Sequence, residues 1–534
     1  MPEASTGTGL RENWKCLLAC TLVSMSPFQY GIDFGLIGGL QAMPGFLMVF
    51  GAKDPTSPIG YQISPGRQQL ISSLMTLGAF ISSSSAGFFA KWLGRRQCLW
   101  MACVLCCASN VVMMATTNLH GLYAGRFLIG IANGWYMTFA QLYIQESTPA
   151  RYRGLMIAVF QFWTSIGTLV GTVVDNSTST IMNKNAYIIP LGIIFIVPVF
   201  MAIGMFFIPE SPRWLLLQDK HAEAEKSLRW MRPNPDAVPE EIADIQSAIL
   251  AEKELAGSAS FIDIFKNPVD RRRTLLAVAA ISTQAASGAM FMIAYGTYFF
   301  EMAKVGNAFM NTCILTAVGV LVIIINSCVI SKIGRRRVFL MIGMSICGVA
   351  QIIVAAVYHV SPGTVSTGKV IVAMSVIYIC GYNGMVATYA WLAGGEIPSQ
   401  RLRSYTFGIA AAVGFAGAWL ATFTAPYFIN PTALNWGWIW GPSCFVTVIW
   451  IYFFLPEIKN RTLEEIDEMF EAKLPARKFR QYVCVGRHVT SDKLDEKDMD
   501  DVHIEHHEAE ARKSTQDKVW SNEKAVAEAT AYIE

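Results

Sequence analysis

The stretch ESTPARYRG, residues 146–154, recurs in the chain as EIPSQRLRS, residues 396–404. In each copy a glutamate is followed by arginines five and seven residues later. Two more echoes keep the same order: WLGRR (92–96) with KIGRR (332–336), and PESPRWL (209–215) with PEIKNRTL (456–463). A shared offset of roughly 240–250 residues predicts two related halves, as in proteins built from internal repeats.

Long apolar runs flank these motifs. Of the 534 residues, 53% are hydrophobic and only 15% are charged, whereas soluble domains carry about 25% charged residues. Because about 20 apolar residues span a bilayer as a helix, we predict an all-α membrane protein with twelve transmembrane helices, six in each half. The expected spans are 14–38, 69–90, 97–117, 121–145, 155–177, 187–208, 274–300, 310–331, 338–359, 369–393, 404–428 and 435–456.

These spans divide the chain into five parts. They are an N-terminus (1–13), a first six-helix half (14–208), a helical linker (209–273), a second six-helix half (274–456) and a hydrophilic tail (457–534). Lys and Arg concentrate in the loops after spans 2, 4, 8 and 10, which places those loops, the linker and both termini in the cytoplasm. The sequon at Asn176 falls on the opposite side and is expected to be glycosylated.

Several function classes are excluded by composition and motifs. A net charge of +3 is too small to indicate nucleic-acid binding. The first apolar run lacks the small-residue cleavage site of a signal peptide, so it is expected to stay as a helix. No Cys/His spacing indicates zinc, and no G-x-S-x-G or P-loop motif is present. We therefore expect neither an enzyme nor a bound cofactor.

One carboxylate lies where a charge is costly. Asp33 is near the middle of QYGIDFGLIGG (29–39), inside the first span, and a charge at that depth costs about 2.5–3.5 kcal/mol on insertion scales. Arg126 in span 4 is the only other deep charge that we identify in the first half, and Asn133 lies on the same helix face. An Asp33–Arg126 pair would offset much of the cost of burial.

The repeated loops place glutamate beside arginine at the cytoplasmic helix ends. Arginine offers a planar fork that binds a carboxylate in a defined geometry. Glu146 can pair with Arg153 and with Arg95 or Arg96, and Glu396 can pair with Arg403 and with Arg335 or Arg336. Pairs that form in only one conformation would bias a rocking motion of the halves. The alternative is that these arginines only set the membrane orientation.

Together these motifs resemble the sugar porter family of the major facilitator superfamily. The matching segments are Gly94-Arg95-Arg96, Glu146 with Arg153-Gly154, PESPRWL (209–215), Gly334-Arg335-Arg336, and Pro456-Glu457 with Arg461-Thr462. YGTYFFE (295–301), EIPSQRLRS and LNWGWIWG (434–441) resemble the fungal α-glucoside and maltose permease branch. The family usually has Asp three residues before the glycine of each GRR loop, where this chain has Lys91 and Ser331.

The resemblance implies roles for the charged residues. Proton-coupled members have an Asp in the first helix and an Arg in the fourth, so Asp33 would carry the proton and Arg126 would be its partner. Asp33 would take up a proton when Arg126 moves away; a static structural pair is the alternative. The expected cytoplasmic gate comprises Arg95, Arg96, Glu146, Arg153, Glu210, Arg213, Arg335, Arg336, Glu396, Arg403, Glu457 and Arg461.

Polar and aromatic side chains recur on single faces of the other helices. A ligand rich in hydroxyl groups needs amide and hydroxyl partners and an aromatic surface. The expected substrate-binding residues are Gln161, Gln284, Ser287, Tyr295, Asn383, Trp391 and Trp419. Gln161, Gln284 and Trp391 match the ligand-binding residues that the family resemblance implies at these positions. The resemblance fails at four positions where the family has amides: Ala285, Met290, Gly319 and Ala418. Packing between helices is the alternative for the Ser and Thr residues.

These observations predict a proton-coupled sugar symporter of a fungal plasma membrane that works by alternating access. The missing amides favour a disaccharide, a sugar acid or another polyol over a simple glucose analogue. The resemblance to the α-glucoside and maltose permease branch implies an α-glucoside. Its partners would be the sugar, protons and lipid, and we expect a functional monomer. An uncoupled hexose facilitator, a sugar sensor and a metabolite exporter remain as alternatives.

Overall fold

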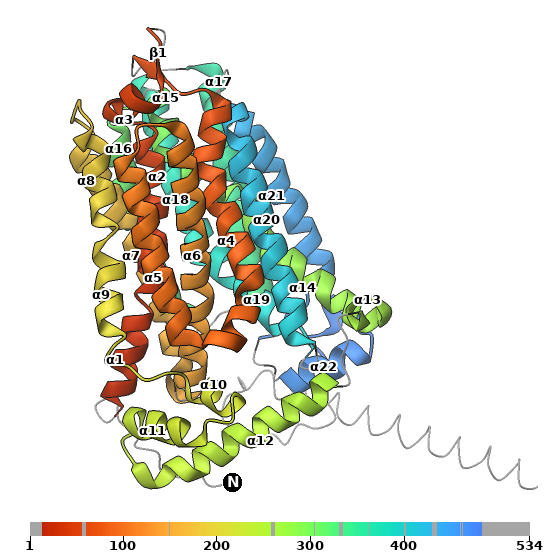
Figure 1. Ribbon diagram of the computed structural model, residues 1–534. Helices are drawn as coiled ribbons and strands as arrows, with labels where there is room; N and C mark the ends of the chain where they lie inside the picture. The colour runs from red at the N-terminus through yellow and green to blue at the C-terminus, as the bar shows by residue number, and fades with distance from the viewer. Residues whose placement is uncertain are drawn as a thin grey trace, which may run out of the picture. The chain divides into compact units, whose positions relative to one another are not determined.

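The computed structural model describes residues 13–55, 60–148, 150–257, 262–303, 305–330, 335–362, 364–399, 402–429, 435–459, 461 and 463–482. They form two compact units, one up to Lys459 and one from Asn460 onward. The first unit is a helical bundle (Figure 1). One end of the bundle, here called the strand end, carries helix α3 (Pro44–Phe50) and the antiparallel strands β1 (Ala52–Lys53) and β2 (Tyr61–Gln62). The other, the linker end, carries α10–α12 (Figure 1).

The first half contains six membrane-spanning segments. They are α1 with α2 (Trp14–Val23, Ser26–Leu40), α4 (Pro65–Leu93), α5 (Arg95–Ala115), α6 (Leu119–Ser147), α7 (Ala150–Thr178), and α8 with α9 (Asn185–Ile193, Ile196–Gly204). The predicted positions of the spans are close to these. Two predicted spans are broken helices, and Pro27 and Pro198, which lack a backbone N–H, lie near the breaks.

The second half repeats this arrangement. Its segments are α14 with α15 (Pro268–Ala286, Ala289–Met302), α16 (Ala308–Ile330), α17 (Arg336–Val360), α18, η2 and α19 (Val365–Gly381, Tyr382–Val386, Ala387–Glu396), α20 (Arg403–Ile429), and α21 (Asn435–Phe454). The break between α14 and α15 comes at Gly288, whose φ of 76° suits a residue without a Cβ atom. η2 is a π-helical turn, which the sequence did not predict.

The helices differ in how clearly their length and hydropathy indicate a membrane span. Within the described residues, nine helical segments are long and apolar enough to cross a bilayer. A tenth span is counted if the segment formed by α1 and α2 is taken together with α3, which bends away from it by 79°. Helices α6 and α7 complete the twelve; each is 29 residues long. Arg126 and Asn133 on α6 and Gln161 on α7 lower the hydropathy of these two helices. Many apolar side chains remain exposed on the bundle, as expected for a surface that faces lipid.

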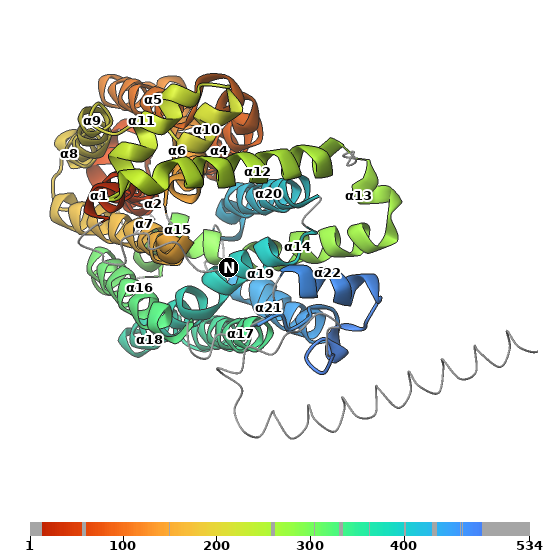
Figure 2. The ribbon, with the colours of Figure 1, turned by 90° about the horizontal axis from the view of Figure 1, so that it is seen from below.

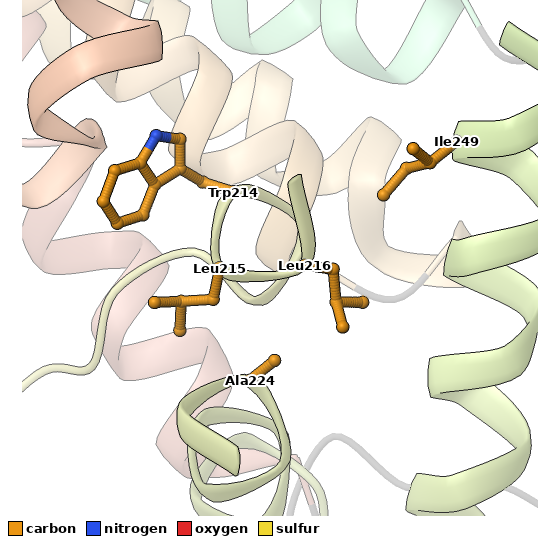
Figure 3. Packing of buried hydrophobic residues seen from close by; sticks show 5 residues of the cluster. All are labelled: Trp214, Leu215, Leu216, Ala224 and Ile249. Atoms are coloured by element: carbon orange, nitrogen blue, oxygen red, sulfur yellow. The ribbon is translucent and has the colours of Figure 1, made fainter. Parts of the chain in front are cut away.

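The linker forms its own small apolar core (Figure 3). Its helices are α10 (Pro212–Leu217), α11 (His221–Met231), α12 (Val238–Gly257) and α13 (Asp263–Lys266). Trp214, Leu215 and Leu216 from α10 pack against Ala224 of α11 and Ile249 of α12. Seen from the linker end, α12 crosses the bundle from the first half towards α13 and α14 (Figure 2). The linker therefore connects the two halves through ordered helices.

The second unit contains α22 (Leu463–Glu471) and a 3₁₀ turn, η3 (Ala476–Lys478). The rings of Phe470 and Phe479 lie 5.0 Å apart and form its core. Arg461 donates to the carbonyl of Tyr482 at 2.7 Å. The Nη1 of Arg461 is 3.9 Å from a carboxylate oxygen of Glu465.

Candidate functional site

Asp33 and Arg126 form a buried ion pair between α2 and α6. An Nη1–Oδ1 distance of 2.6 Å joins them, and the residues are 1% and 2% exposed. Asn133 donates to the second carboxylate oxygen at 3.1 Å. Both oxygens of Asp33 are therefore satisfied by the two residues that the sequence placed on one face of span 4.

The same arginine also reaches α4. Its Nε donates to the carbonyl of Ile71 at 3.0 Å, and its Nη2 lies 3.0 Å from the sulfur of Met75. Removing one partner of such a pair costs about 3–5 kcal/mol because the other charge stays buried without compensation. Moving α6 away from α2 would therefore break a buried ion pair.

Small residues bring α2 and α7 together on the opposite face of α2. A Cβ atom on Gly35 would lie 2.5 Å from the carbonyl oxygen of Thr168, and one on Gly171 would lie 2.7 Å from the carbonyl oxygen of Ile32. Such close backbone approach requires glycine on both helices. The regular spacing of Gly31, Gly35 and Gly39 is a sequence signal for this contact, although we did not predict it.

Arg126 is not the only other deep charge of the first half, which corrects our prediction. Asp175, in the last turn of α7, is 1% exposed. Its position at the end of span 5 suggested a residue at the membrane surface. Packing against Gly39 of α2 buries it instead, because a Cβ atom on Gly39 would overlap the carboxylate.

Three predicted ligand amides are half-buried in the bundle. Gln161 lies on α7, Gln284 on α14 and Asn383 in the π turn η2. The side chain of Gln284 lies within 3.4 Å of both the carbonyl of Ala387 and the hydroxyl of Tyr382. Gln284 is thereby held against η2, the element that carries Asn383.

The glycine at position 319 leaves room for Asn383. A Cβ atom on Gly319 would lie 2.6 Å from the Nδ2 atom of Asn383. The amide of Asn383, from the neighbouring π turn η2, therefore occupies the space beside Gly319. A π turn displaces the following residues relative to an α-helix and often marks a functional site.

The other predicted ligand residues differ in their surroundings. The hydroxyl of Ser287 is buried and donates to the carbonyl of Gln284 at 2.6 Å. Tyr295 is fully buried and donates to the carbonyl of Thr422 at 2.9 Å. Trp391 is 38% exposed and Trp419 is half-buried. In this conformation, the two tryptophans are more accessible to a ligand than Ser287 and Tyr295.

Hydrogen bonds join the two halves near the strand end. The hydroxyls of Thr172 and Thr316 lie 2.9 Å apart, and the Cys313 thiol is 3.3 Å from the Thr172 carbonyl. Tyr295 also lies 3.4 Å from the carbonyl of Gln68 at the start of α4. The halves are therefore closed against each other at the strand end.

A polar cluster joins helix ends within the first half at the linker end. Arg95 binds Glu146 at 2.7 Å, and Ser211 donates to the other oxygen of Glu146 at 2.5 Å. Glu210 accepts from the backbone N–H groups of Arg95, Arg96 and Ser211 at 2.9–3.1 Å. Burial raises the pKa of Glu210, while these N–H groups oppose the shift. PESPRWL thus caps α5 and anchors the linker.

The second half repeats the cluster with a shift of one residue. Arg336 binds Glu396 through two hydrogen bonds of 2.9 and 3.1 Å. Glu457 accepts from the N–H groups of Arg336 and Arg337 at 3.1 and 3.2 Å. Arg336, rather than Arg335, therefore corresponds to Arg95. Helix α5 begins directly after Gly94, whereas α17 begins one residue later in its motif.

The side chains of the remaining predicted gate residues, and of the predicted glycosylation site, differ in their exposure. Arg96 and Arg213 are half-buried, and Arg335 is exposed just before α17. The side chains of Arg153 and Arg403 lie outside the described residues. Asn176 is half-buried within the last turn of α7.

Comparison with known proteins places this architecture in a family. The family model described as "Sugar (and other) transporter" matches residues 19–470. The chain belongs to the sugar transporter family. Its relatives include a major facilitator-type transporter, ecdD, of Aspergillus rugulosus, which is 28% identical over 88% of this chain and 89% of the relative. The chain is a multi-pass membrane protein of the sugar porter type.

Two yeast relatives have different functions. The high glucose sensor RGT2 of Saccharomyces cerevisiae is 29% identical over 86% of this chain, which spans 61% of the sensor's length. The low-affinity glucose transporter HXT3 of the same yeast is 26% identical over 86% of this chain and 82% of the transporter.

The fold matches solved structures of the same superfamily. The inward-open xylose transporter XylE of E. coli superposes with a TM-score of 0.71 at 19% identity, covering 85% of this chain and 99% of XylE. The structures show the same twelve-helix architecture, with six helices in each half.

Proposed function

We propose that this sugar transporter family member is a proton-coupled symporter. The observation that carries the proposal is the buried Asp33–Arg126 pair, which Asn133 completes. A buried carboxylate that can gain and lose a cationic partner is a proton carrier whose charge is coupled to helix movement. This role agrees with what the family resemblance implies.

The proposed cycle uses that pair as a switch. In this conformation Arg126 neutralises ionised Asp33. Separation of α6 from α2 leaves the carboxylate without its counter-charge, so Asp33 takes up a proton from the side to which the site is open. Asp33 can then pass through the closed state as a neutral acid, so its carboxyl group no longer needs Arg126 beside it. Release on the other side restores the pair with Arg126.

The Glu–Arg clusters fix the helix ends at the linker end, which we assign to the cytoplasm. In this conformation, the Arg95–Glu146 and Arg336–Glu396 pairs each lie within one half. They hold α5 to α6 and α17 to α19 in this conformation. We propose that these pairs weaken and re-form as the halves rock.

We propose that the substrate is an α-glucoside or another sugar that is not glucose. Gln161, Gln284 and Asn383 would bind sugar hydroxyls, and Trp391 and Trp419 would face the apolar surface of the ring. The replacement of family amides by Ala285, Met290, Gly319 and Ala418 changes the hydrogen-bond partners of a glucose-sized ligand. The Gly319–Asn383 contact supports a rearranged site.

Electrogenic uptake tests the proposal. The chain is expressed in a yeast that lacks its own sugar transporters, and hexoses, α- and β-disaccharides and sugar acids are supplied one at a time. We expect one substrate class to alkalinise the medium and Asp33→Asn to abolish this response. Asp236→Asn, at an exposed acid of the linker, is the matched control and should leave uptake unchanged. Uptake without proton flux in the unsubstituted protein would instead establish a facilitator.

A sugar sensor is the second candidate, because one relative is a glucose sensor. A sensor would bind sugar in purified protein but show no flux in proteoliposomes. Net efflux of a metabolite from loaded vesicles would identify an exporter. Both outcomes are separate from a failure of proton coupling, since neither depends on Asp33.

A further inference from the structure

Asp175 is the buried carboxyl group that the proposed cycle leaves unused. It lies in the last turn of α7, 1% exposed, and neither of its carboxylate oxygens has a hydrogen-bond partner among the described residues. Asp33, on the neighbouring helix, has both Arg126 and Asn133. Two buried acids in one interface therefore have opposite surroundings.

The position of Asp175 lies at the contact between the two halves. Gly39 of α2 packs directly on its carboxylate. Thr172, one turn earlier on α7, bonds to Thr316 of α16 and accepts from Cys313. Thr178, further along α7, lies 4.0 Å from the sulfur of Met43. The carboxyl group is thus enclosed by α2 and by the contact between α7 and α16.

The groups around Asp175 provide no counter-charge in the described part of the chain. The titratable or charged residues on the helices packed against α7 at and above mid-bundle are Tyr30 and Asp33 on α2, Cys313 on α16, Tyr187 on α8, and His120, Tyr123 and Arg126 on α6. The His120 side chain is exposed, and its ring packs on Tyr123. The Asp33 carboxylate binds Arg126, and the Tyr187 ring packs on Phe46 and Phe50. Lys184, just before α8, is exposed.

An ionised carboxylate in such a place is strongly unfavourable, whereas the neutral acid costs far less. We propose that Asp175 is a second proton-binding site. It holds a proton while the halves are closed at the strand end. When they separate and water reaches the carboxyl group, the O–H bond breaks and the proton passes to water.

This site would make the conformational equilibrium depend on pH. A proton that binds only the closed form stabilises that form, and by linkage closure strengthens proton binding. One such site changes the closed-to-open ratio by at most about tenfold per pH unit, since one proton is exchanged. Acidification at the strand end therefore favours closure. The proposal rests on the two-state motion of the proposed transporter but not on its sugar or on Asp33.

Distance measurements between spin labels test the site in the full chain. Labels are placed at His120→Cys at the start of α6 and Val365→Cys at the start of α18, both exposed near the strand end. The background has its reactive native cysteines replaced, and the protein is in lipid nanodiscs without sugar. We expect the long-distance population to grow as pH rises.

Asp175→Asn removes the titrating group, so the long-distance population should no longer grow as pH rises. Asp236→Asn, at an exposed acid of the linker, is the matched control and should retain the dependence on pH. An unchanged pH response in Asp175→Asn would overturn the proposal, as would a distance that does not respond to pH in the unsubstituted chain. If Asp175→Asn does not fold, Asp175→Thr replaces it, because a threonine hydroxyl can bond within its own helix. The assay uses no substrate, so a failure of sugar transport is read separately.

Discussion

Arg95 and Arg336 occupy equivalent positions in the two halves, although an alignment of the two Gly-Arg-Arg motifs pairs Arg95 with Arg335. Each binds the glutamate at the end of a neighbouring helix, and each donates its backbone N–H to a second glutamate that follows the last span of its half. The location of the first helical residue decides which arginine reaches Glu396.

This equivalence makes a position-specific prediction. Arg336→Ala should lower thermal stability and uptake, because a charged hydrogen-bonded pair contributes about 1.5–3 kcal/mol per bond. Arg335→Ala, its exposed neighbour, should stay close to the unsubstituted protein in both. Stability in detergent and initial uptake rate measure the difference. Equal losses in the two variants would contradict the assignment of Arg336.

Two substitutions of Glu210 test whether the role of its carboxylate is to accept hydrogen bonds. Glu210→Gln retains one acceptor oxygen and removes a charge that burial disfavours, whereas Glu210→Ala leaves the three N–H groups without their acceptor. We therefore expect Glu210→Ala to lower the unfolding temperature clearly more than Glu210→Gln. The reverse order would show that the charge, rather than the acceptor, holds the linker.

The pH dependence of stability follows from the raised pKa of Glu210. The folded protein binds the Glu210 proton more tightly than the unfolded chain does. The contribution of this group to stability therefore falls as pH rises from the unfolded pKa, about 4.3, through the folded pKa, and is constant above it. Unfolding temperatures measured across that window should lose this slope in Glu210→Gln. A slope of the same size in the variant would exclude Glu210 as its source.

The contact between α2 and α7 can be tested at one glycine. Gly35→Ala places a Cβ atom 2.5 Å from the carbonyl oxygen of Thr168, and overpacking of this kind costs about 1–3 kcal/mol. Gly87→Ala is the control, since nothing lies within 4 Å of its Cβ position. Gly35→Ala should reduce folded yield and uptake, while Gly87→Ala should not. A tolerated Gly35→Ala would mean that the helices can separate without loss.

A side chain at position 319 should disturb the amide of Asn383, which lies beside Gly319. Gly319→Ala would push against the Nδ2 atom of Asn383, so we expect a several-fold rise in KM for the transported sugar with little change in stability. Gly408→Ala, where a Cβ atom meets open space, is the matched substitution. Uptake kinetics of purified protein in proteoliposomes provide the measurement. An unchanged KM in Gly319→Ala would remove Asn383 from the proposed site.

Periodicity and repeats were sufficient to predict the helices but not their interruptions. A run of apolar residues specifies a span because the bilayer demands it, whereas the breaks at Gly288 and in η2 depend on local backbone geometry. Gly288 has a left-handed conformation, and a Cβ atom on it would lie 2.8 Å from the side chain of Trp440 in α21. A single sequence does not show that contact.

The charged pair was predictable for a different reason. A carboxylate and a guanidinium in two apolar spans offset much of each other's cost of burial when they pair, so a pairing of Asp33 with Arg126 was the expected arrangement. Asp175 escaped the same reasoning because a charge one turn from a helix end can as easily face water. Its burial results from Gly39, a residue 136 positions earlier in the chain.

The order of residues along the chain was enough to predict the membrane-spanning helices, the two related halves, the pairing of Asp33 with Arg126, and membership of a transporter class. The spans and the ion pair follow from the free-energy cost of placing backbone and charge in lipid. The two halves follow from the repeated motifs, and the transporter class follows from the family resemblance. The folded arrangement was needed to show that Arg336 binds Glu396, that Asn383 fills the space at Gly319, and that Asp175 is enclosed without a hydrogen-bond partner among the described residues. Those outcomes depend on how closely particular helices approach one another, and side-chain volume at distant positions sets that distance.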